Sequence, residues 1–156
     1  CPKNYDGQFR GPVQLRFALA NSYNIPAVKM LAMNGLTEFV ASASAFGIST
    51  FKDPSHYGLS LTLGGGEVRM TDMAKAFSVF SNEGITKDLV SILKVTDRNG
   101  RVLYEYKDPN VKKDIHKPLD YANALRIQGK RIISRDTSFL ISHMLLDNYA
   151  RSAAFG

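Results

Sequence analysis

The sequence predicts an α+β fold that is mainly helical and carries one β-hairpin. Apolar residues recur at helical spacing in several segments between residues 13 and 148. Between residues 89 and 106 the period changes to alternation, around an Asn99-Gly100 pair that is typical of a tight hairpin turn. The length of 156 residues suits one domain that is large enough to bury a core.

The first 46 residues are expected to hold three short helices. The first starts at Val13 and ends before the Asn-Ile-Pro segment at 24–26, because the residue before a proline avoids helical torsions. The second covers residues 27–33, with the proline in its first turn, where the missing N–H costs nothing. The third covers residues 37–46 and is closed by a glycine.

The middle of the chain changes from loop to helix to strand. Residues 48–66 are expected to form a loop and residues 71–81 a fourth helix. Residues 89–96 and 101–106 are expected to be the two strands of the hairpin.

The last third begins with a polar, irregular segment at 107–129 that could hold a short helix near 121–127. Residues 130–133 are expected to be extended. Ser134 or Asp136 is expected to cap a final helix that runs to about residue 148. The residues expected to point inward from it are Ile141, Met144, Leu145 and Tyr149.

Composition excludes several classes of function. The net charge of +6 admits an anionic partner, but the 20 Lys and Arg are spread along the chain without an aromatic-interleaved basic stripe, so nucleic acid is not expected. The single Cys rules out an internal disulfide, and the three His share no ligand spacing, so no metal is expected. No apolar run approaches the roughly 20 residues of a membrane helix.

Ser22 and Asn24 form the most informative polar pair. In a continuous helix two such positions would face about 200° apart, but at a break between helices both side chains can enter one cleft. A hydroxyl there can relay a proton, and a carboxamide can donate and accept hydrogen bonds with a peptide-like ligand. From spacing alone a structural alternative stays open, in which Asn24 caps the second helix and Ser22 ends the first.

Four blocks of sequence, in order, resemble the transpeptidase domain of class A penicillin-binding proteins. Residues 19–28, Leu-Ala-Asn-Ser-Tyr-Asn-Ile-Pro-Ala-Val, resemble the Ser-x-Asn segment, and residues 4–13 are similar to the segment that leads into it. Residues 57–68 with 74–84 resemble the next block of the family. Residues 147–156 resemble the approach to its Lys-Thr-Gly strand.

The chain also departs from the family pattern. The family's Ser-x-x-Lys and Lys-Thr-Gly blocks are absent, and Arg69-Met70 stands where the family often has Thr-Pro. Residues 49–52 spell Ser-x-x-Lys, but they follow the Ser-x-Asn element and lie in a loop, so we interpret them as a coincidence. The glycines at 64–66 lack the Lys of a phosphate-binding loop, which favours a tight turn into the fourth helix, with a wall of the cleft as the alternative.

The resemblance implies the helical lobe of a penicillin-binding-protein/β-lactamase-like transpeptidase domain plus a peripheral β-hairpin. Residues 1–156 would be a partial transpeptidase domain, truncated at both ends. The parent would be a serine D,D-transpeptidase that crosslinks peptidoglycan through an acyl-enzyme, without metal or cofactor. In that reaction Ser22 would relay a proton and exchange a hydrogen bond with the absent Lys, Asn24 would bind the donor's amide and steady that Lys, and Tyr23 would line the cleft.

The partners implied are peptidoglycan stem peptides and β-lactam antibiotics, at the extracytoplasmic face of a bacterial membrane, with any membrane anchor outside this chain. The chain alone is predicted to be inactive, because a proton relay without the nucleophile has no step to serve. One alternative is a non-catalytic cell-wall or protein interaction module on the same scaffold. Another is a hydrolytic relative, a carboxypeptidase or a β-lactamase.

Overall fold

The computed structural model describes residues 2–107 and 129–156, so the helix expected near 121–127 lies outside the described residues. Helices dominate, and the predicted fold class is confirmed. The α-helices are α1 (Leu15–Ala20), α2 (Asn24–Asn34), α3 (Leu36–Ala45), α4 (Met70–Ser81), α6 (Arg135–Leu146) and α7 (Asn148–Phe155). The 3-10 turns are η1 (Pro54–His56) and η2 (Leu59–Leu63), and the strands are β1 (Ile85–Thr86), β2 (Lys94–Thr96), β3 (Val102–Glu105) and β4 (Lys130–Arg131).

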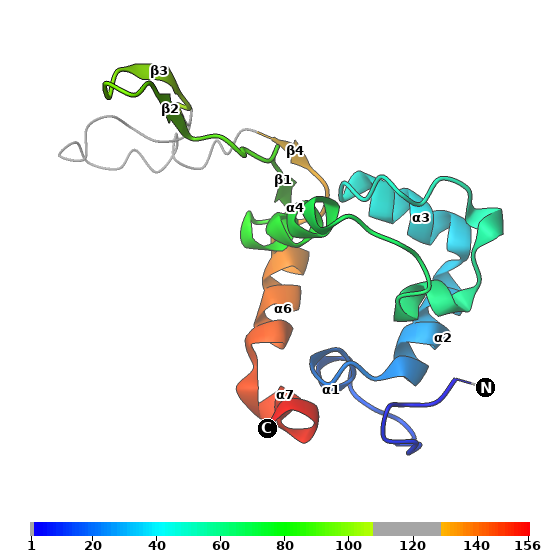
Figure 1. Cartoon of the computed structure of the whole chain (residues 1–156). Coiled ribbons are helices and arrows are strands. Elements are labelled where there is room, and N and C mark those ends of the chain that lie inside the picture. Colours follow the sequence, from blue (N-terminus) through cyan, green and yellow to red (C-terminus); the bar gives the residue numbers. More distant parts are fainter. Residues whose placement is uncertain (1, 108–128) are drawn as a thin grey trace.

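The helices form two packed groups that meet at α1. Helix α2 packs against α3 and η2, whereas α1 packs against α2, α6 and α7, and α4 packs against α6. Figure 1 shows α2 and α3 on one side and α6 on the other, joined by α1 and α7 at one end and by α4 at the other. The junction of α1 and α2 therefore lies where the two groups come together.

The core of the first group lies between α2, α3 and the segment that follows them. It is formed by the buried side chains Leu31, Val40, Ala43, Phe51 and Leu61. Apolar residues three or four positions apart supply the inner face of each helix, as the sequence predicts. Gly35, with φ of 88°, makes the sharp turn that lets α3 start immediately after α2.

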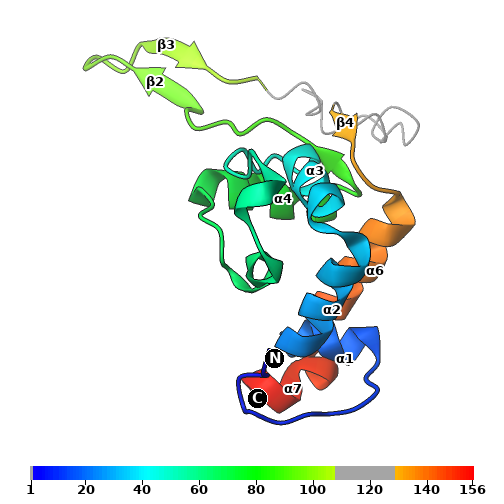
Figure 2. The same ribbon diagram turned by 90° about the vertical axis from the view of Figure 1, so that its right-hand side faces the viewer.

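Two small antiparallel sheets complete the described fold. The hairpin pairs β2 with β3 around the predicted turn, where the carboxylate of Asp97 accepts hydrogen bonds from the backbone N–H groups of Asn99 and Arg101, both at 2.9 Å. Strands β1 and β4 pair residues 85–86 with residues 130–131. The hairpin projects away from the helices, as Figures 1 and 2 show, so its placement as peripheral is confirmed.

Several boundaries differ from the predictions. Helix α2 begins at Asn24, three residues before the predicted start, and the predicted loop at 48–66 contains the turns η1 and η2. The sequence predicts one last helix, but the structure has two: α6 ends at Leu146 and α7 begins at Asn148. The inward orientation predicted for Leu145 and Tyr149 is wrong, because Leu145 is 37% exposed and Tyr149, on α7, is 82% exposed.

None of the described helices combines the length and the apolar composition that crossing a membrane requires.

Candidate functional site: the Ser22-Tyr23-Asn24 turn and its cleft

The break between α1 and α2 is a helix C-terminal motif with an unusual residue in it. The backbone N–H of Tyr23 donates to the carbonyl of Ala18 at 3.0 Å, and that of Ser22 donates to the carbonyl of Leu19 at 3.1 Å. This pattern normally places glycine in the left-handed position, yet Ser22 occupies it with φ of 54°. Among the described residues, Glu83 is the other non-glycine with a positive φ.

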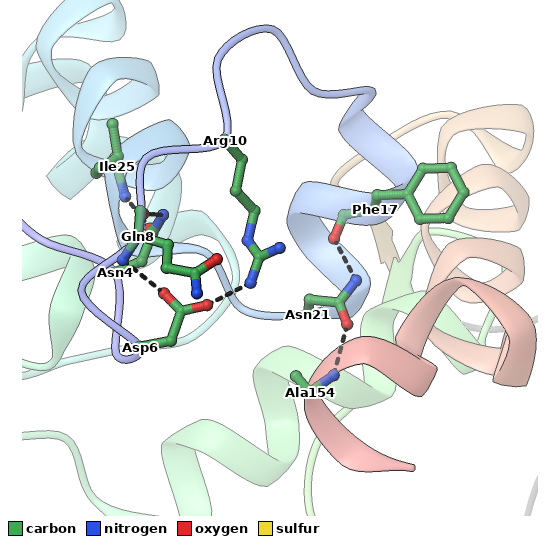
Figure 3. Close-up of polar contacts among 8 residues, drawn as sticks. All are labelled: Asn4, Asp6, Gln8, Arg10, Phe17, Asn21, Ile25 and Ala154. Atoms are coloured by element: carbon green, nitrogen blue, oxygen red, sulfur yellow. Dashed lines mark hydrogen bonds and ion pairs between the residues drawn. The ribbon is translucent and has the colours of Figure 1, made fainter.

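Helix α2 is capped from outside its own segment. Its N-cap residue, Tyr23, makes no side-chain cap bond. The Oδ1 of Asn4 accepts a hydrogen bond from the backbone N–H of Ile25 at 3.2 Å, while its Nδ2 donates to the carbonyl of Gln8 at 2.8 Å (Figure 3). Asn4 is 6% exposed. The segment before α1 therefore satisfies a helix end that would otherwise be open.

The alternative role for Asn24, as the cap of α2, is wrong. Asn24 is the first residue of the helix, and its Nδ2 donates to the carbonyl of Lys3 at 2.9 Å. This bond is a second tie between the N-terminal segment and the turn. The capping role that spacing suggested for Asn24 belongs to Asn4 instead.

Arg10 holds the middle residue of the turn, Tyr23. Its guanidinium lies 4.8 Å from the centre of the Tyr23 ring and pairs with the carboxylate of Asp6. The backbone N–H of Gln8, at 3.0 Å, and then Arg10 hold the pKa of Asp6 below its ordinary value of 3.8. The cation and the aromatic face attract each other, so the ring has a defined position.

The predicted site residues share one cleft. Ser22, Tyr23 and Asn24 all line a cavity of about 670 Å³ between α1, α2 and η2. Asn34 and Thr62 also line this cavity, and the larger apolar residues of its wall are Leu15, Leu19, Met30, Phe39 and Leu63. All three residues therefore border the same space. The break itself lies at residues 21–23, because residues 24–26, where the sequence predicts it, belong to α2.

The described residues that line this cleft offer hydroxyl and carboxamide groups for hydrogen bonding. Of the described residues, no carboxylate, lysine, arginine or histidine lines it. A serine hydroxyl without an adjacent base is a poor nucleophile. Ser22 and Asn24 can therefore orient a ligand and pass on a proton, but a base and a nucleophile would have to come from elsewhere.

Ser49 and Lys52, which match the Ser-x-x-Lys pattern, do not form a pair of nucleophile and base. The Oγ of Ser49 donates to the Oδ2 of Asp72 at 2.7 Å, and its backbone N–H donates to the same atom at 3.0 Å. These bonds hold the pKa of Asp72 below its ordinary value of 3.8. Residues 49–53 are not helical, so Ser49 and Lys52 do not share a helix face.

The glycine run serves packing. A Cβ at Gly65 would lie 2.8 Å from the carbonyl oxygen of Ser60, and one at Gly66 would lie 2.5 Å from Leu61 and 2.7 Å from Phe51. The residues that line the cleft from this region are Thr62 and Leu63, not the glycines. Of the two interpretations of the glycine run, this geometry therefore supports the tight, closely packed turn and not the wall of the cleft.

Two asparagines at the site were not predicted. Asn4 caps α2, and Asn21 bonds to α7 from the end of α1. Asparagine is common at turns and helix ends, but the partners that define these two roles, Ile25 for Asn4 and Ala154 for Asn21, lie 21 and 133 residues away in the sequence. No local pattern could have identified them.

No protein-family model matches the chain. Penicillin-binding protein 4 of Bacillus subtilis is 37% identical to it over 110 residues, which are 69% of this chain and 18% of that protein. Penicillin-binding protein 1A of Clostridium acetobutylicum is 38% identical over 107 residues, 67% of this chain and 13% of that protein. The crystal structure of penicillin-binding protein 1A from Haemophilus influenzae superposes with a TM-score of 0.67 at 26% identity, covering 99% of this chain and 24% of that one.

The fold and these matches define the class: the chain is homologous to the penicillin-binding proteins, which confirms the resemblance predicted from its sequence. Within that class the relatives named here are penicillin-binding proteins 1A and 4. The chain spans 13 to 18% of the length of these two curated relatives.

Proposed function

We propose that residues 1–156 are part of the transpeptidase domain of a longer penicillin-binding protein, at the extracytoplasmic face of a bacterial membrane. That protein crosslinks peptidoglycan stem peptides through an acyl-enzyme and is trapped by β-lactams at the acyl stage. One observation carries the proposal: Ser22, Tyr23 and Asn24 line a single cleft at a turn where a non-glycine backbone is held left-handed. Strained backbone of this kind concentrates at functional sites.

The proposed reaction gives Ser22 a defined step. A serine outside this chain forms a bond to the penultimate D-Ala carbonyl of the donor, and the bond to the terminal D-Ala nitrogen breaks. The proton of that serine passes through the family's lysine and the Ser22 hydroxyl to the leaving amine. Proton transfer of this kind typically contributes 10²–10⁴-fold to a rate.

Asn24 is assigned to orientation. Its Nδ2 is held by the carbonyl of Lys3, so its Oδ1 has a fixed direction and can accept the donor's amide N–H. Tyr23, held against Arg10, would form a rigid wall beside the peptide. Holding a substrate in reactive geometry supplies a large share of many rate enhancements.

The first experiment is labelling with a fluorescent penicillin, applied to the protein as its gene encodes it and, separately, to the 156-residue chain. The encoded protein is expected to label covalently and to be protected by unlabelled penicillin. The chain alone is expected to remain unlabelled and to leave a thioester substrate intact. An encoded protein that takes up no label would contradict the proposal, and label on Ser49 of the chain would revive the misplaced motif.

A non-catalytic module on the same scaffold is the second candidate. It is favoured by the absence of a base or nucleophile among the described residues that line the cleft. The gene distinguishes the two: transpeptidase requires a Ser-x-x-Lys block before Ser22 and a Lys-Thr-Gly block after Gly156. A hydrolytic relative would carry both blocks, and it would release free acid instead of a crosslinked peptide.

A further inference from the structure

We infer that Asn21 and helix α7 form a clamp that holds Ser22 in its left-handed conformation, which makes Asn21 a positioning residue for the proton relay. The relay itself rests on the proposed function above. The clamp rests on contacts that join the end of α1 to the other end of the described chain.

The Asn21 carboxamide is fully engaged. Its Nδ2 donates to the carbonyl of Phe17 at 2.9 Å and to the carbonyl of Ala150 at 2.6 Å, and its Oδ1 accepts from the backbone N–H of Ala154 at 3.0 Å. Figure 3 shows the bonds to Phe17 and Ala154 on opposite sides of the side chain. Asn21 is 5% exposed, so losing any of these bonds would leave a buried polar group without a partner.

Helix α7 is in turn fixed to α1 at a second point. The Oδ1 of Asp147 caps α7 by accepting from the backbone N–H of Ala150 at 2.9 Å, and its Oδ2 accepts from the Nη1 of Arg16 at 2.8 Å. Ala150 is 1% exposed, so the helices are in close contact between these points. Arg16 lies near the start of α1 and Asn21 at its end, so α7 holds α1 along its whole length.

Ser22, which follows Asn21 directly, needs such support because of its left-handed backbone conformation. Glycine would occupy the position of Ser22 without strain, but it would supply no hydroxyl. A serine there persists only when the surrounding structure imposes its conformation. Glu83, the other described non-glycine with a positive φ, is also held from outside, in its case directly: Arg131 donates to its carbonyl at 2.8 Å and Arg135 to its Oε1 at 2.9 Å.

The variant that tests the clamp is Asn21→Asp. It keeps the size and the acceptor for Ala154, but it places a carboxylate oxygen against two carbonyl oxygens. We expect hydrogen exchange of the Ser22 and Tyr23 amides to rise roughly tenfold or more, as the loss of a buried hydrogen bond implies. The rate of penicillin acylation of the encoded protein should fall by about as much. Asn21→Ala, which adds no charge, should act in the same direction.

Ser138→Ala is the matched control. The Oγ of Ser138 donates to the carbonyl of Phe80 at 2.7 Å, and the residue is 1% exposed, so this variant also removes a buried bond between a side chain and a helix carbonyl. It joins α6 to α4, away from the turn. We expect it to lower the melting temperature while leaving amide exchange at Ser22 and the acylation rate unchanged.

The two measurements separate the possible failures. Unchanged exchange at Ser22 and Tyr23 in both Asn21 variants would overturn the clamp, whatever the acylation rate does. Faster exchange with an unchanged acylation rate would overturn the positioning role. An absence of acylation in the unaltered protein would refute the proposed function, and the exchange data would still decide whether the clamp exists.

Discussion

At the scale of single residues, Ser22 exchanges stability for a hydroxyl in the cleft. A left-handed backbone costs an L-residue roughly 1–2 kcal/mol, and glycine avoids that cost. The structure retains the costly residue at a position that lines the cavity with Asn24. Sites at which local stability is sacrificed in this way are typical of function.

Ser22→Gly should stabilise the fold while removing the hydroxyl that the proposed reaction uses. The variant should raise the free energy of unfolding of the chain by about 1 kcal/mol, because it relieves the backbone strain. Ser22→Ala, which keeps the strain and removes only the hydroxyl, should give no such gain. Urea unfolding of the two variants beside the unaltered chain measures the difference, and a less stable Ser22→Gly chain would show that the conformation is not strained.

Gly66 should be intolerant of a side chain for packing reasons alone. Its Cβ would enter the core between Leu61 and Phe51, so Gly66→Ala is expected to destabilise the fold by about 1–3 kcal/mol. Gly58→Ala is the matched control, because a Cβ there meets nothing within 4 Å and its φ is −116°. Equal melting temperatures for the two variants would contradict the packing role of the glycine run.

At the scale of elements, the contact between α1 and α7 should give stability a dependence on acid pH. The backbone N–H of Ala150, and then Arg16, hold the pKa of Asp147 below its ordinary value of 3.8. Arg16 also lies 3.1 Å from the Nδ1 of His143 on α6. Because the folded pKa is the lower one, the contribution of Asp147 is complete above the ordinary value and is lost as pH falls through the folded value.

Asp147→Asn tests this dependence. Asparagine can still cap α7, but it loses the ion pair with Arg16. The variant should therefore have a lower free energy of unfolding than the unaltered chain at pH 7. This difference in free energy should be smaller at pH 3, as measured by urea unfolding at both pH values. A difference in the free energy of unfolding that stays constant with pH would show that the ionised carboxylate is not the stabilising form. Asp88→Asn provides the comparison, because the Asp88 side chain is 99% exposed in its pair with Lys75 and should matter little.

The elements also show where sequence reasoning succeeds and where it stops. Helices α1 to α4 follow local signals, such as Gly35 after α2, and the hairpin follows from Asn99-Gly100. The sequence also predicts a break after α1, but it places the break at residues 24–26, which lie inside α2. The pairing of β1 with β4 and the contacts of α7 with α1 join segments far apart in the chain, and no local period encodes such partners.

At the scale of the whole molecule, the described surface exposes large apolar side chains on several elements. Those that are more than half exposed include Met33, Met70, Phe139 and Leu146. The similar crystal structure is about four times as long as this chain, which covers 24% of it. Under the proposed function, other parts of the parent domain would cover these faces.

The 156-residue chain, produced alone, is therefore expected to self-associate. Apolar side chains that are exposed together favour association over solution as single molecules. Sedimentation velocity of the purified chain would show species larger than a monomer at micromolar concentration. A monodisperse monomer that melts cooperatively would instead indicate that these faces need no partner.

The central claim is that the Ser22 hydroxyl passes on a proton during acyl transfer. The most direct test is the rate at which a fluorescent penicillin acylates the encoded protein, with Ser22 or with alanine in its place. The acylation rate should fall by about 10²–10⁴-fold in Ser22→Ala, with the melting temperature nearly unchanged. An acylation rate equal to that of the unaltered protein would contradict it.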